Sequence, residues 1–268
     1  MNLHTITIFT IASFLFHGVT AQQVKTYSGA YKGGSATYQY YEDKDLNWVL
    51  NGAFKYSTSV YFTGYGQGQG IKSGKYKNNL QDGFWKFSFD FKDENFSTSG
   101  NFKNGLKEGE WVFFELEKAS KKIIRKSIVH YNKDILFGTF QFICNSRYSR
   151  DYTEISDIII YGKLNNVAKM DSIWIIKFKD HKIPCEYIKE YRNGSLVNGM
   201  YRDLSDGSNV KFRTNADDFA QDMKEYYSKR TPHPLDIILP DDAIKFWNTW
   251  TNTTCSGPFT YNPLLYFH

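Results

Sequence analysis

The stretch Gly74-Lys-Tyr-Lys-Asn-Asn-Leu-Gln-Asp-Gly-Phe-Trp-Lys-Phe87 decides the fold, because the chain repeats it. It returns as Gly100-Asn-Phe-Lys-Asn-Gly-Leu-Lys-Glu-Gly-Glu-Trp-Val-Phe113 and, more loosely, as Tyr131-Asn-Lys-Asp-Ile-Leu-Phe-Gly-Thr-Phe-Gln-Phe142. Shorter forms open at Gly29 and Gly52, and we count seven units, four clear and three degenerate. A short unit repeated along a chain is typical of an array in which each unit packs against its neighbours.

Each unit has the features of a β-hairpin. A turn dipeptide stands at the same place in five units, as Gly33-Gly34, Asn78-Asn79, Asn104-Gly105, Lys133-Asp134 and Asn193-Gly194. Asn and Gly tolerate the positive φ angles of a two-residue hairpin turn. Large rings then alternate with polar residues, as at Trp85, Phe87, Phe89 and Phe91. This is the period of a strand with one buried face.

The spacing of the units predicts how the hairpins are joined. Successive units begin 22 to 33 residues apart, counted from Gly52 to Gly74 and from Val129 to Gly162. This leaves no room for crossover helices, which parallel strands require. The predicted fold is therefore mainly β, an antiparallel meander of repeated hairpins in a single sheet, followed by two short C-terminal helices.

The rings at equivalent repeat positions are the candidate functional residues. We expect two rows across neighbouring hairpins, with a further ring in the degenerate copy; the candidates are Tyr76, Trp85, Phe102, Trp111, Tyr131, Phe140, Trp174, Tyr191 and Tyr201. We interpret them as the core of a thin sheet, and a platform for sugar rings or another protein is the alternative. Glycines precede the large ring by two positions, at 83, 109, 138 and 199. They predict either β-bulges or places where a ring lies flat on the main chain.

The N-terminal segment predicts export. Residues 1–21 carry no charged side chain and hold an apolar stretch from Ile6 to Phe16. They end with small residues at Val19 and Ala21, the positions that a signal peptidase reads. We therefore assign residues 1–21 to a signal peptide. The apolar stretch is too short for a bilayer, so no transmembrane anchor is expected.

The remaining chain divides into two parts. Residues 22–213 hold the repeats, which become degenerate after residue 129. Residues 214–268 carry helix signals and form a predicted helical cap or tail, because apolar residues recur at helical spacing in two groups. These groups are Phe219, Met223 and Tyr226, then Ile244, Trp247 and Trp250. The helices are placed to cover the terminal edge of the sheet or to lie on its aromatic face.

The repeat phrase resembles the bacterial variant of the MORN repeat. The resemblance covers residues 27–204, and the copies at 74–87 and 100–113 carry it best. It implies a hairpin array used as a binding or scaffolding surface, with no catalytic residues to carry over to this chain. The degenerate copies after residue 129 and the helical tail depart from the family pattern.

Charged and reactive residues indicate no catalytic or metal chemistry. The net charge is +5, and we interpret its basic cluster, Lys121, Lys122, Arg125 and Lys126, as a solvated face, so no nucleic-acid partner is expected. The histidines lack metal-site spacing, and the glycine-rich stretch 64–70 lacks the context of a phosphate loop. We assign no catalytic, metal or cofactor residues. Of the three cysteines, Cys185 and Cys255 are the predicted disulfide pair.

These observations predict an exported, non-catalytic β-repeat protein. It would act as a binding or scaffolding surface in the cell envelope or outside the cell, for an unknown protein or an envelope glycan. Two alternatives stay open: a glycan- or peptidoglycan-active enzyme that uses scattered carboxylates, and a periplasmic immunity-type inhibitor. A deep cleft with two carboxylates would favour the enzyme, and a flat apolar patch would favour binding.

Overall fold

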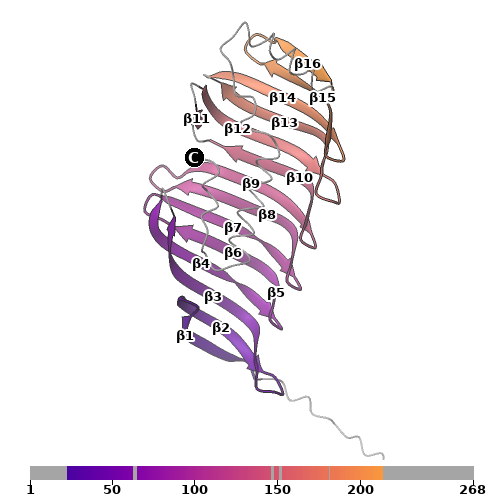
Figure 1. Cartoon of the computed structure of the whole chain (residues 1–268). Coiled ribbons are helices and arrows are strands. Elements are labelled where there is room, and N and C mark those ends of the chain that lie inside the picture. Colours follow the sequence, from indigo (N-terminus) through magenta and orange to yellow (C-terminus); the bar gives the residue numbers. More distant parts are fainter. Residues whose placement is uncertain (1–22, 63–64, 146–147, 151–152, 181, 214–268) are drawn as a thin grey trace, which may run out of the picture.

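The computed structural model describes residues 23–62, 65–145, 148–150, 153–180 and 182–213. All strands of this part belong to one open, curved sheet (Figure 1). The strands are β1 (Lys25–Tyr31), β2 (Gly34–Glu42), β3 (Trp48–Phe62), β4 (Gly66–Lys77), β5 (Leu80–Gln81), β6 (Gly83–Asp90), β7 (Glu94–Lys103), β8 (Leu106–Glu117), β9 (Lys122–Asn132), β10 (Ile135–Cys144), β11 (Tyr148–Arg150), β12 (Thr153–Leu164), β13 (Met170–Asp180), β14 (Ile183–Arg192), β15 (Ser195–Asp203) and β16 (Asn209–Arg213).

The topology confirms the antiparallel meander. Fourteen strands follow one another across the sheet in chain order, while β5 extends the pairing with β4 and β11 pairs with β12. Every pairing is antiparallel, as at β7 and β8. Each strand therefore lies beside its neighbour in sequence. The two predicted C-terminal helices and the signal peptide lie outside the described residues.

The tight turns confirm four of the five predicted dipeptides. Both turn residues have positive φ at 78–79, 104–105, 133–134 and 193–194. The first turn is one residue earlier than predicted, at Lys32 and Gly33 with φ of 44° and 78°. Gly34 belongs to β2 instead, since its backbone runs tightly against Ser57 of β3. The predicted Gly33-Gly34 dipeptide was wrong because two consecutive glycines leave the position of the turn open.

The core lies on one side of the sheet, which we call the inner face. It carries the three buried indoles of Trp85, Trp111 and Trp174. Each indole lies over a glycine of the preceding strand, at 74, 100 and 162 respectively, where an added Cβ would meet the ring. Such close approach is available only to glycine.

The glycines before the large rings are bulge residues rather than ring platforms. Gly83, Gly109 and Gly138 have φ of 74°, 69° and 69°, and the strand register shifts next to Gly109 and Gly138. The prediction was wrong for Gly199, which has no positive φ; the register of β14 and β15 shifts beside Val197 instead. A bulge adds twist, so these glycines curve the sheet.

The basic cluster is not a uniformly solvated face, contrary to the expectation. The side chain of Arg125 is only 5% exposed and forms an ion pair with Glu115, which is equally buried. Arg125 also donates a hydrogen bond to the hydroxyl of Tyr65 at 3.1 Å. The sequence hides this pair because Glu115 lies on the neighbouring strand, opposite Arg125 in the β8–β9 register.

Candidate binding surface

Eight of the nine candidate rings lie in the buried core. The exposed fractions of Trp111 and Trp174 are both 0%. The other buried rings are Trp85, Phe102, Tyr131, Phe140, Tyr191 and Tyr201. Tyr76 is half-buried and packs edge-on against Trp85, with ring centroids 5.0 Å apart.

One predicted row is Trp85, Trp111, Phe140 and Tyr201, and the other is Tyr76, Phe102, Tyr131 and Tyr191. The two rows interleave, because Phe102 contacts Trp85 at 6.2 Å as well as Trp111. Phe87 also lies between the two indoles and stacks with both at 5.9 and 6.4 Å. Phe102 meets Trp111 edge-on at 5.0 Å, and Phe140 contacts Trp174 at 5.7 Å. Offset and edge-on contacts of this kind stabilise a core beyond the area they bury. In this structure the rings hold the sheet together and do not form an accessible platform.

The opposite side, the outer face, changes character along the sheet. One row of directly paired residues crosses it, and its N-terminal half holds hydroxyls and lysines: Ser28, Thr37, Lys55, Ser73, Lys86 and Ser99. From β8 to β15 the same row is mainly apolar and is interrupted by Gln141, and it ends at Lys211 of β16. We call its apolar residues the outer stripe: Val112, Ile128, Tyr161, Ile175, Ile188 and Met200.

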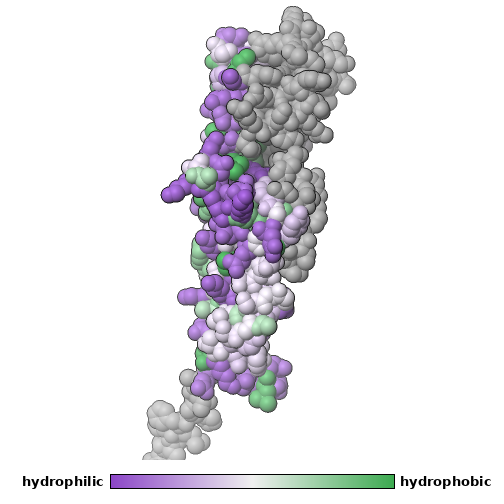
Figure 2. All heavy atoms as spheres, turned by 90° about the vertical axis from the view of Figure 1, so that its left-hand side faces the viewer, coloured by the Kyte–Doolittle hydropathy of each residue, from purple (hydrophilic) through white to green (hydrophobic). Residues whose placement is uncertain are grey.

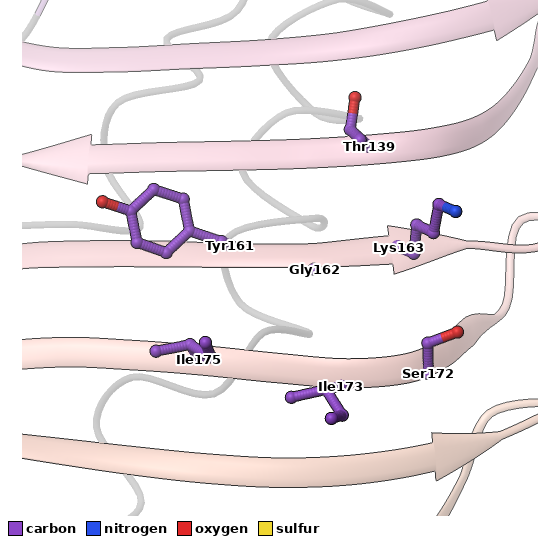
Figure 3. Close-up of a pocket in the computed structure, with 7 residues that line it drawn as sticks. All are labelled: Thr139, Tyr161, Gly162, Lys163, Ser172, Ile173 and Ile175. Atoms are coloured by element: carbon purple, nitrogen blue, oxygen red, sulfur yellow. The ribbon is translucent and has the colours of Figure 1, made fainter.

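A shallow hollow of about 370 Å³ lies on the outer stripe. Three neighbouring strands supply its lining, β10, β12 and β13 (Figure 3). The lining residues are Thr139, Tyr161, Gly162, Lys163, Ser172, Ile173 and Ile175. Ile173 and Tyr161 are 57% and 38% exposed, so the hollow opens to solvent through apolar side chains. No carboxylate lines it.

Cations border the stripe on one side. The adjacent outer row runs Lys126, Ile143, Ile159, Lys177, Glu186 and Arg202. The single carboxylate of Glu186 lies 3.6 Å from both Lys177 Nζ and Arg202 Nη1. Because Lys126, Lys177 and Arg202 outnumber the one carboxylate of this row, Glu186, the border carries a net positive charge.

The side of the molecule seen in Figure 2 differs from the stripe. The described residues form a narrow column there, and most of its surface is hydrophilic with isolated apolar spots. The apolar row of the outer face therefore does not extend over the described part of this side.

Sequence reasoning missed the outer stripe, although a signal was present. Residues between the core rings change from Ser73, Lys86 and Ser99 to Val112 and Ile128 along the repeat. The residues that alternate with the rings are polar in the unit at 85–91, but this pattern does not hold in the later copies. A comparison of this single position across the copies would have shown the change.

Several sequence expectations can be placed on the structure. The described part of 64–70 belongs mainly to β4, where Gly68 lies close to Phe91. Cys185 is buried, with its sulfur 3.1 Å from the Tyr201 hydroxyl. Its predicted partner Cys255 lies outside the described residues, so the pairing stays a prediction. Within the described ranges, no helix could cross a membrane, and no cluster of His, Cys, Asp or Glu could hold a metal ion.

Comparisons with family models, curated proteins and solved structures give no match. The resemblance to the MORN repeat therefore depends on the repeated phrase alone. Function has to be argued from the surface itself.

Proposed function

We propose that this chain is an exported, non-catalytic binding protein that holds a partner protein on the outer stripe. The observation that carries the proposal is the change along one outer row from hydroxyls and lysines to partly exposed apolar side chains, beside the exposed Tyr161 and Ile173 of the hollow. Soluble proteins rarely expose a large apolar patch to water unless another surface covers it. The flat hollow without carboxylates supports binding rather than hydrolysis of a glycan.

The chemistry of the stripe favours a protein partner over a glycan. Five of its six residues are aliphatic, and Tyr161 is its one aromatic plane. Sugars are held by aromatic planes together with polar groups, whereas aliphatic side chains fit the apolar centre of a protein interface. The cations at Lys126, Lys177 and Arg202 favour acidic residues beside the partner's apolar segment.

A pair of variants at one repeat position tests the proposal. Ile173 and Phe84 both precede the buried tryptophan of their unit and are 57% and 60% exposed. Only Ile173 lines the hollow; Phe84 pairs with Asn101 on the polar half. Ile173→Glu should abolish capture of the partner from the native envelope or secreted fraction, while Phe84→Glu should leave it intact.

Mass spectrometry of the captured proteins reads the result. A protein held by the wild type and by Phe84→Glu, but lost with Ile173→Glu, supports the stripe as the binding surface. If the two variants capture the same proteins as the wild type, the stripe is not the binding site.

Export has a separate test. The small residues at Val19 and Ala21 predict cleavage after Ala21. N-terminal sequencing of the protein from its native source should begin at Gln22. A chain that retains Met1 outside the cytoplasm contradicts the signal peptide.

A further inference from the structure

The inner face is more deeply buried than one sheet explains. Its largest side chains are each less than 2% exposed: Trp85, Trp111, Trp174, Phe87, Phe89, Phe96, Phe113, Phe140 and Phe142. All described strands lie in a single sheet, so within the described ranges no second layer faces these rings. The outer face shows what one sheet leaves uncovered, with Phe84 60% and Tyr161 38% exposed.

The inner face also contains a charged pair that is almost fully shielded from water. Glu115 and Arg125 have side chains 2% and 5% exposed, and they lie opposite each other in the register of β8 and β9. Their row continues into Phe96 on one side and Cys144 on the other. Burial of an ion pair to this degree requires material above the sheet as well as beside it.

The chain itself has a segment of suitable composition and position. Residues 214–268 follow directly on β16 and contain two groups of apolar residues at helical spacing, from Phe219 to Tyr226 and from Ile244 to Trp250. Short helices with so much apolar surface are not stable alone in water. Residues 1–22 are the less suitable segment, because most of them belong to the predicted signal peptide.

The segment is long enough to reach the buried rings. Strands in a sheet are spaced by about 4.8 Å, so β6 lies roughly 43 Å from β16 across the nine steps between them. At about 1.5 Å per helical residue, residues 214–268 span roughly 80 Å. The centre of the inner face is therefore within reach of the tail.

We propose that residues 214–268 dock on the inner face, with their apolar sides against the rings of β6 to β14. The tail then completes the core as a second layer, rather than only capping the edge strand β16. This arrangement leaves the outer stripe as the apolar surface that stays open to a partner, but it does not depend on what binds there.

Photo-cross-linking of the full mature chain tests this docking. Trp247 is replaced with p-benzoyl-phenylalanine, a large aromatic probe that inserts into neighbouring C–H bonds on illumination. A second chain carries the probe at Ile173, in the hollow on the outer face. Peptide mapping then locates each cross-link, and circular dichroism checks that both chains keep the β-sheet spectrum.

The Trp247 probe should link within its own chain to inner-face residues of β6 to β14, and the Ile173 probe should give no link to residues 214–268. Mixing isotopically light and heavy chains separates links within a chain from links between copies. Light–heavy links to the inner face would assign its cover to a second copy and overturn the proposal. Links from the tail to the outer stripe, or no tail link to the inner face, would also overturn it.

Discussion

At the residue scale, three of the repeat units place the indole of a tryptophan over a glycine of a neighbouring strand. In each of three units the Trp Nε1 donates a hydrogen bond to the carbonyl of the residue after that glycine. The acceptors are Lys75 for Trp85 at 3.0 Å, Asn101 for Trp111 at 3.2 Å and Lys163 for Trp174 at 3.1 Å. The ring thus buries its apolar plane and satisfies its one polar group at the same time. This explains why glycine and tryptophan recur together in the phrase.

Removing one of these indoles should destabilise the sheet. Trp85→Ala and Trp111→Ala are each expected to lower the free energy of unfolding by about 3–5 kcal/mol, because a fully buried ring leaves a cavity. Trp48 is 50% exposed, so Trp48→Ala is the control and should cost far less. Denaturant unfolding of the three variants measures the difference. Equal losses would mean that the indoles over glycine are not the core.

The raised pKa of Tyr76 predicts that the stability of the fold decreases at alkaline pH. Burial, with a smaller effect of Tyr31, raises the pKa of Tyr76 from its ordinary value of 10.0 to about 12. The folded protein therefore holds the phenol proton more tightly than the unfolded chain does. This stabilisation is complete below pH 10 and is lost as the pH rises from 10 through 12.

Melting curves between pH 9 and 12 test this dependence. Tyr76→Phe should reduce the fall in melting temperature above pH 10, because phenylalanine has no proton to lose. Tyr65, whose pKa burial also raises to about 12, accounts for part of the remaining fall. Tyr61→Phe, at a ring that is 73% exposed, is the control and should follow the wild-type curve. An unchanged curve for Tyr76→Phe would exclude this phenol as a source of alkaline instability.

At the element scale, four tight turns, at 78–79, 104–105, 133–134 and 193–194, are hydrogen-bonded to the hairpin before them. The second turn residue donates its N–H to a carbonyl of that hairpin, as from Asn79 to Leu50 at 2.9 Å and from Asp134 to Lys107 at 3.0 Å. In these two turns a side-chain oxygen accepts a hydrogen bond in return, from the N–H of Leu50 or Lys107 at 2.7 Å. The turns therefore contribute to the pairing between units as well as closing each hairpin.

The residue that is commonest at this turn position in the repeat should stabilise the turn at Lys133. Lys133 has φ of 49°, a region that costs most L-residues about 1–2 kcal/mol but that Asn tolerates. The equivalent positions 78, 104 and 193 are all Asn. Lys133→Asn should raise the free energy of unfolding by about 1 kcal/mol.

Asp134→Gly is the matched comparison in the same turn. It relieves a φ of 66° but removes the acceptor of the Lys107 N–H, so its gain should be smaller or negative. Denaturant titration of both variants measures the two effects. If Asp134→Gly raises the free energy of unfolding more than Lys133→Asn does, the hydrogen bond between the Lys107 N–H and Asp134 contributes little to stability.

The hairpins could be predicted from the sequence because their signals are local. Asn104-Gly105 and the rings after it specify a turn and a half-buried strand without reference to the rest of the chain. The change from Ser99 to Val112 at one repeat position signals the outer stripe, but its full extent could not be predicted, since it depends on a register carried across seven strands and shifted by bulges beside Gly109 and Gly138. The burial of Arg125 was missed for the same reason, because its partner comes from another strand.

At the scale of the whole molecule, the described strands form a chain of nearest-neighbour contacts. Strand order follows sequence order from β1 to β16, so no described strand joins the two ends of the sheet directly. In such arrays stability is a sum of unit and interface contributions, and the ends open before the centre.

Hydrogen exchange on the intact protein should show this locality. Phe54 in β3 is 8% exposed and packs against Tyr76 and Trp85 of the next strands. Phe54→Ala should cost about 3–5 kcal/mol locally and raise amide exchange in β1 to β4, while β12 to β15 keep their wild-type rates. Phe142→Ala, at a ring 1% exposed in β10, is the matched variant and should instead accelerate exchange in β9 to β13. An even rise in exchange from β1 to β16 with either substitution would contradict this locality. It would mean that a disturbance in one hairpin reaches strands that share no contact with it, so that the sheet opens as one cooperative unit.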